Sequence, residues 1–284
     1  MKKFFVGCGV VVVLLIGLGV FGLVQFGQWA QRSLPDFEAF GQRRAELVEA
    51  YGPEDAYVPP VDGAYDPARV ALYVDLRELL WPGQQEIARE IDGFLDRELS
   101  GEGGGIGGFV SQMKAAFGTV GLLARHAAVT DSLLLEHEMG RGEFTHLQLI
   151  LTRGWMDLGR ERAEWERLLA DAPPGDDGLQ AMLEIHQAAE RRAAELLQAH
   201  RRNLMDAASA PLPDSVAVTI SMEGDRLPFV DPVPPRLDAA FDDHAVRLRM
   251  TRPKTLGAWL AETPALLQEE TFDESRTRRV RVEF

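Results

Sequence analysis

The stretch EHEMGRGEFTH, residues 136–146, marks a corner at which one helix ends and the next begins. Gly140 and Gly142 interrupt the helical spacing of apolar residues on either side, as glycines in a short interhelical turn do. Two histidines and three glutamates also fall within these eleven residues. The stretch therefore has two interpretations, a structural corner or part of a metal or catalytic site.

Helical spacing of apolar residues extends outward from this corner in both directions. One helix ends near Trp81–Pro82 and a second covers 87–95, while a long third helix runs from about Val110 to the corner. A fourth helix carries Leu151 to Leu169, and a fifth runs from Leu179 to about Met205. Helices joined by short links pack antiparallel. The sequence therefore predicts an antiparallel helical bundle over residues 67–207.

Beyond the bundle the apolar pattern changes to alternation, which is typical of strands. It occurs in SVAVTISM (215–222), AVRLRM (245–250) and RRVRVEF (278–284), with a helical segment between the last two. We expect a small α+β subdomain over 208–284. The terminal strand would pair inside this subdomain, or alternatively add to the edge of a partner's sheet.

The amino-terminal region has a different composition. Phe4 to Val24 carry no charge, and as a helix they would span roughly 30 Å, the thickness of the hydrocarbon core. We expect residues 1–27 to form an uncleaved transmembrane signal anchor, because no small-x-small cleavage pair follows; a cleaved signal peptide is the alternative. Lys2 and Lys3 place the amino terminus in the cytoplasm and the remaining chain in the periplasm or outside the cell.

Residues 28–66 link this anchor to the bundle. A juxtamembrane helix is predicted up to Gly52, followed by a proline-rich strap without long apolar runs. Asp66 and Pro67 then begin the first bundle helix, because Asp caps helices and Pro fits their first turn.

Composition narrows the possible functions. The 284-residue chain has 44 acidic and 30 basic residues and a net charge of −14, so we expect no nucleic-acid partner. Cys8 is the only cysteine and lies in the apolar segment, which rules out a disulfide within one chain. Gly103, Gly105 and Gly108 match G-x-G-x-x-G, but no strand precedes them. We therefore expect no cofactor.

Metal binding is the remaining chemical hypothesis. Glu143 and His146 stand three apart, which puts them on one helical face, and bundles present metal ligands in this way. His200 lies with His186 on the apolar stripe of the fifth helix. A buried histidine held by hydrogen bonds explains the same pattern, and this structural interpretation is preferred. The weak metal candidates are His126, His137, Glu143, His146 and His186.

The sequence thus indicates a mainly α, single-pass membrane protein of bacterial envelope type with an acidic helical ectodomain. Its expected role is binding or scaffolding, with the membrane and an envelope protein as partners. The alternative is a metal-dependent envelope enzyme that uses the histidine and glutamate cluster. No nucleophile with a recognisable base is apparent.

Overall fold

The computed structural model describes residues 41–99, 122–156, 158, 161, 163–165, 167, 177–221 and 227–262. In these residues the protein is mainly helical, and no strand occurs among them. The longer helices are α2 (Pro67–Leu99), α4 (Arg141–Ile150) and α6 (Asp177–Ala207), and residues 41–51 and 122–136 are also helical. The short elements are η1 (Glu54–Ala56), η2 (Leu151–Trp155, a π-helix turn), α7 (Asp214–Thr219), α8 (Pro235–Asp243), α9 (Ala245–Met250) and α10 (Leu256–Ala261).

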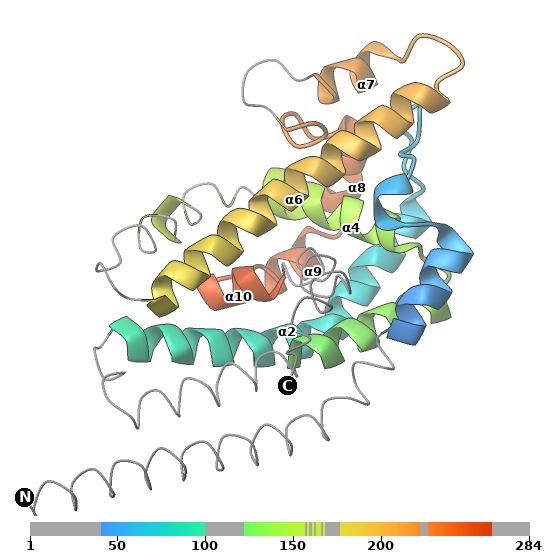
Figure 1. The fold of residues 1–284 in the computed structure, drawn as a ribbon. Helices are drawn as coiled ribbons and strands as arrows, with labels where there is room; N and C mark the ends of the chain where they lie inside the picture. Colours follow the sequence, from blue (N-terminus) through green and yellow to red (C-terminus); the bar gives the residue numbers. More distant parts are fainter. Residues whose placement is uncertain are drawn as a thin grey trace, which may run out of the picture.

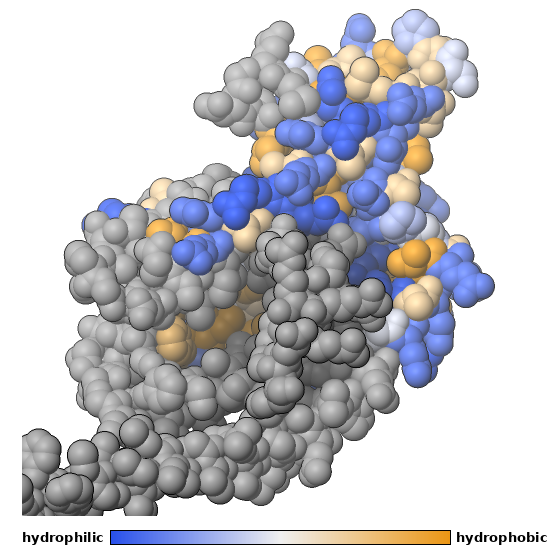
Figure 2. Space-filling view, in the orientation of Figure 1, coloured by the Kyte–Doolittle hydropathy of each residue, from blue (hydrophilic) through white to orange (hydrophobic). Residues whose placement is uncertain are grey.

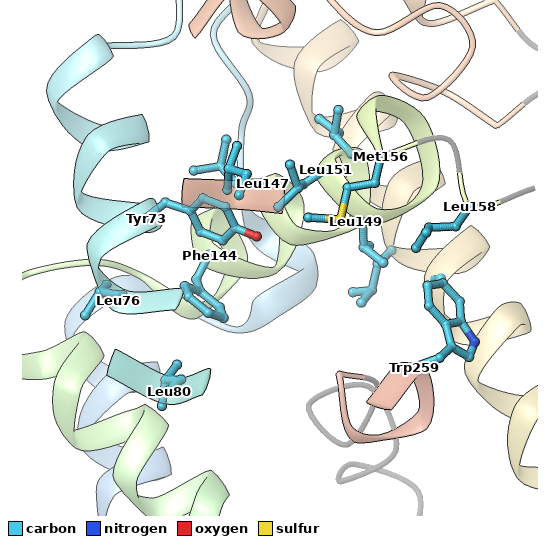
Figure 3. Packing of buried hydrophobic residues seen from close by; sticks show 14 of the residues in the cluster. Tyr73, Leu76, Leu80, Phe144, Leu147, Leu149, Leu151, Met156, Leu158 and Trp259 are labelled. Carbon is cyan, nitrogen blue, oxygen red and sulfur yellow. The ribbon is translucent and has the colours of Figure 1, made fainter. Parts of the chain in front are cut away.

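Helix α4 is the centre of this arrangement, and α6 crosses over it (Figure 1). Nine of its ten residues are buried. Figure 3 shows the apolar side chains of α4 and η2 lying between Tyr73 of α2 on one side and Trp259 of α10 on the other. The turn at Gly140 places α4 directly after the 122–136 helix, so the structural corner predicted from residues 136–146 is confirmed.

Helix α2 runs without a break through Pro82, so the prediction of two helices separated near Trp81–Pro82 is wrong. Proline in a helix interior removes one hydrogen bond and costs about 3 kcal/mol. Pro82 lies on the exposed face, while Leu80 and Ile87 on either side of it are buried. Packing of one continuous apolar face therefore outweighs the local cost of the proline.

The fourth helix, predicted to carry Leu151 to Leu169, is interrupted, because η2 ends at Trp155 and Leu158 is not helical, so this prediction is wrong. Three other predicted helix boundaries agree with the structure. The 41–51 helix stops at Gly52, whose φ of +80° is a left-handed conformation that glycine adopts without strain. Helix α2 begins at Pro67, where the Asp66 carboxylate accepts a hydrogen bond from the Ala68 amide at 2.9 Å. The helix predicted over 179–205 is α6.

The two described segments predicted as strands are helices, so the α+β prediction is wrong for both. Residues 214–219 form α7 and residues 245–250 form α9. In α9 only Leu248 of the three alternating apolar residues is buried. Over six residues an alternating pattern does not separate strand from helix when most of its apolar residues face solvent. The third segment, 278–284, lies outside the described residues.

Helix α10 packs along α2 and brings the region after residue 208 onto the bundle. The Asp92 carboxylate of α2 accepts hydrogen bonds from the Gly257 amide at 2.8 Å and from the Thr255 hydroxyl at 2.7 Å. The Thr255 hydroxyl in turn caps α10 by accepting from the Ala258 amide. One carboxylate thus fixes the start of this helix.

The proposed anchor at Phe4 to Val24 and the glycine-rich stretch 101–108 lie outside the described residues. Among the helices that the structure does describe, none combines the length and the apolar composition needed to cross a bilayer.

We predict that Gly142→Ala destabilises the protein although alanine favours helices. A Cβ at this position would lie 2.6 Å from the Glu54 carbonyl oxygen and 2.7 Å from the Tyr57 Cβ. Such overpacking costs about 1–3 kcal/mol, more than the roughly 1 kcal/mol that alanine gains over glycine in a helix. The free energy of unfolding, measured by chemical denaturation, should fall accordingly.

Gly41→Ala is the matched control, because a Cβ there would meet no atom of the described residues within 4 Å. Its stability should stay the same or rise. Equal effects of the two substitutions would contradict the close packing of Gly142 against residues 54–57.

Candidate functional site

The strap, residues 52–66, lies against α4 and α6 and is held by hydrogen bonds to its backbone. The Asn203 side chain donates to the carbonyl oxygens of Asp55 at 2.7 Å and Tyr57 at 3.1 Å. The His200 ring lies 3.0 Å from the carbonyl oxygen of Glu54 through its Nε2. The strap has only the single helical turn η1, so its buried carbonyl oxygens need such partners from outside the strap.

Two fully buried histidines form the centre of this contact. The Nδ1 atoms of His146 on α4 and His200 on α6 are 3.1 Å apart. The Nε2 atom of His146 is 2.8 Å from the Tyr65 hydroxyl. A continuous hydrogen-bonded chain therefore runs from Tyr65 through both histidines to the Glu54 carbonyl.

The Glu54 carbonyl at the end of this hydrogen-bonded chain determines which atom is the donor in each hydrogen bond. A carbonyl oxygen only accepts, so His200 donates from Nε2 and, when neutral, has a bare Nδ1. His146 must then donate from its own Nδ1 to His200, which leaves its Nε2 as the acceptor for the Tyr65 hydroxyl proton. Each ring thus has one defined tautomer.

Aromatic rings enclose the pair and exclude water. Phe229 meets the His146 ring edge to face at 4.9 Å between centroids, and Tyr57 contacts both histidines. Burial, and then the neighbouring His200, hold the pKa of His146 well below its ordinary value. Burial likewise lowers the pKa of His200 to about 4. Both rings are therefore neutral at neutral pH.

A buried ionic cluster lies next to the histidines, around the first turn of α4. Arg141 pairs with Asp131 and lies 3.5 Å from the Glu54 carboxylate, which also accepts from Thr145. Arg44 approaches Asp131 at 3.0 Å from the 41–51 helix. Burial and the nearby Arg141 lower the pKa of Arg44. The cluster contains two guanidinium groups and two carboxylates, so its net charge is zero.

A second polar group lies deeper, where α10 meets α2 and α4. Arg77 pairs with Glu262, and its guanidinium also donates to the Thr251 hydroxyl at 2.9 Å. The Gln148 side chain donates to the Glu262 carbonyl at 2.8 Å. Burial raises the pKa of the Glu262 carboxyl, opposed by Arg77.

Two small cavities flank Gln148 and Glu262, with volumes of about 10 and 20 Å³. The larger also touches Gln84, whose Oε1 is buried and unpaired, as is Oε2 of Glu262. A cavity of this size holds about one water molecule. These cavities are too small for an organic substrate.

The predicted metal candidates are not brought together as a cluster. Glu143 forms two hydrogen bonds with Arg69, at 2.9 and 2.5 Å, and the His146 ring bonds to Tyr65 and His200. The His126 ring packs against Gly83, and burial lowers its pKa to about 4. His137 is half-buried at the end of its helix, and His186 is buried on α6.

Within the described residues no three His, Cys, Asp or Glu side chains are arranged to hold a metal ion. The metal hypothesis therefore gains no geometric support there. Sequence reasoning noted His200 beside His186 on the apolar stripe, but it did not identify Tyr65, Asp131 or Arg141 as buried partners. From the sequence, Asp131 and Arg141 could be recognised only as charged residues near a turn.

Comparison of the chain with models of protein families, with curated proteins and with solved structures found no match. A general base works best with a pKa near the working pH, and both central histidines have pKa values far below 7. Their closed hydrogen-bonded chain suits a structural contact between strap and bundle.

We predict that acidification destabilises the protein through these histidines. Unfolded histidine binds a proton near pH 6.5, whereas folded His200 stays neutral down to about pH 4. The free energy of unfolding therefore has its full value above pH 6.5 and decreases as the pH falls from 6.5 towards 4. The loss is up to about 1.4 kcal/mol per pH unit for each such histidine.

His200→Gln tests this directly, because glutamine can donate to the Glu54 carbonyl but takes up no proton. Its free energy of unfolding should fall less steeply than that of the wild type between pH 6.5 and 5. Asn203→Ala, which removes hydrogen bonds to the strap but no titratable group, is the control and should keep the wild-type slope. A His200→Gln slope equal to that of the wild type would refute the assignment.

Proposed function

We propose that the protein is a single-pass, membrane-anchored envelope protein whose acidic helical domain acts as a binding or scaffolding module. The observation that carries this proposal is the closed interior around α4. Arg141, Thr145, His146 and Gln148 of this helix all hydrogen-bond or pair with groups of the same chain. The two cavities described beside Gln148 are water-sized, so we place recognition on the surface of the domain.

The outer face of the domain supports this role. Figure 2 shows hydrophilic residues gathered along the exposed side of α6. This face and the net charge of −14 suit a well-solvated domain that meets its partners through polar contacts. Membrane attachment would come from the uncharged segment Phe4 to Val24.

The anchor is tested by membrane fractionation of the full-length protein. We expect it to stay with the membranes after alkaline carbonate washing, because an apolar span of this length is held by the hydrocarbon core. Leu14→Arg with Ile16→Arg should release it, since charges at the centre of a span are costly. Leu14→Val with Ile16→Val is the control and should stay bound. Release of the wild type would contradict the anchor.

The orientation is tested with single cysteines, since Cys8 is the only natural one. In a Cys8→Ser background, Met250→Cys on the exposed face of α9 should react with a membrane-impermeant maleimide once the outer barrier is opened. Lys3→Cys should react only after the membrane is disrupted. The reverse pattern would show that the domain is cytoplasmic.

The metal-dependent alternative makes a different prediction. Elemental analysis of the purified full-length protein should find no metal in stoichiometric amount, because the His146 and His200 nitrogens are hydrogen-bonded to each other and to the strap. Melting temperatures with and without chelator are measured in parallel and should agree. A stoichiometric metal whose removal lowers the melting temperature would favour the enzyme.

A further inference from the structure

Helix α9 has an inner face fixed to the bundle. Leu248 is buried, and the Arg247 guanidinium binds the Glu78 carboxylate at 2.6 Å and the Asp75 carboxylate at 2.6 Å, both on α2. These hydrogen bonds raise the pKa of Arg247 above its ordinary value. The helix is thus held in one orientation, and its other face is directed away from α2.

The outer face combines apolar and basic side chains. Val246 and Met250 are 77% and 71% exposed, more than any other large apolar residue among those described. Arg249 lies between them in sequence and on the same helical face, because positions three and four apart are neighbours on a helix. Lys254, four residues beyond α9, is also exposed. We call Val246, Arg249, Met250 and Lys254 the α9 patch.

The charge of this patch is opposite to that of the chain. Residues 245–254 contain four bases and no acid, whereas the chain as a whole has a net charge of −14. Arg247 and Arg252 are used in ion pairs with Glu78 and Glu161. Among the described residues no carboxylate is within ion-pair distance of Arg249 or Lys254. These two bases are therefore available to an outside anion.

We propose that the α9 patch docks on the anionic lipid surface of the membrane that anchors the chain. Exposed apolar side chains enter the boundary between headgroups and acyl chains, and flanking bases attract anionic headgroups. An acidic protein could offer similar charges, but the bilayer is favoured because the anchor keeps it within reach. The inference therefore rests on the proposed membrane anchoring.

Tethering is essential to this proposal. Two apolar side chains and two bases are too few to keep a free protein on a bilayer. A linked second contact, however, forms at a high effective concentration, so that a weak patch becomes occupied. The result would be a domain that lies against the membrane in one orientation and leaves other faces, such as that of α6, free for partners.

The experiment uses the full-length protein in nanodiscs, with an environment-sensitive fluorophore on Met250→Cys in the Cys8→Ser background. We expect blue-shifted, brighter emission in phosphatidylglycerol discs compared with phosphatidylcholine discs. The shift should shrink as salt is raised, because salt screens the bases. Arg249→Glu with Lys254→Glu should abolish it.

The matched control carries the same label at Met205→Cys, on exposed α6, with Arg202→Glu as the charge reversal. Neither change should produce a lipid-dependent shift. Emission at position 250 that is unchanged by anionic lipid in a disc-bound protein overturns only the docking proposal. An equal blue shift in both lipids, or a blue shift that is already present in detergent, would also overturn only the docking proposal. Failure to enter discs would overturn the anchor as well.

Discussion

The arrangement of the described residues depends on one constraint, which is that the central helix is buried and yet polar. Helix α4 carries Arg141, Thr145, His146 and Gln148 in buried positions. An unpaired buried polar group costs several kcal/mol, and a buried charge costs more. Each of these side chains therefore requires a partner, and the partners come from distant parts of the chain.

These partners determine where the surrounding elements lie. The strap supplies Glu54 and Tyr65, the helix before the corner supplies Asp131, α6 supplies His200, and the end of α10 supplies Glu262. Buried ion pairs add little net stability, because desolvation of both charges offsets most of their attraction. Loss of one partner, however, leaves the other charge buried and alone. Such contacts favour one arrangement of helices over others that bury similar apolar area.

Apolar periodicity predicted the positions of the helices better than it predicted which residues they contact. Helix α6 and the corner at Gly140 could be predicted because amphipathic spacing and glycines are local signals. The strap contacts could not, since Tyr65 and His146 are separated by 81 residues and the sequence does not give the rotation of each helix. The sequence therefore left metal ligation open beside the preferred interpretation of buried, hydrogen-bonded histidines, and it could not predict that His146 and His200 bond to each other.

The failed strand predictions have a related physical cause. Alternation indicates a strand when one face is buried, but in α9 the outward residues Val246 and Met250 are apolar as well. Over six residues, such an alternation of apolar and basic side chains fits a strand as well as a helix. Pro82 illustrates the opposite case, in which tertiary packing tolerates a residue that local rules reserve for helix ends.

The 41–51 helix bears on how the domain would sit at a membrane. Arg44 pairs with Asp131 and Leu47 is buried, so the 41–51 helix is attached to the other described helices. Residues 25–40 separate this helix from the proposed anchor, and even fully extended they would reach at most roughly 55 Å. As a helix they would span only about 24 Å. A domain anchored in this way would stay close to the bilayer, and the proposed contact of α9 with lipid would then form at high effective concentration.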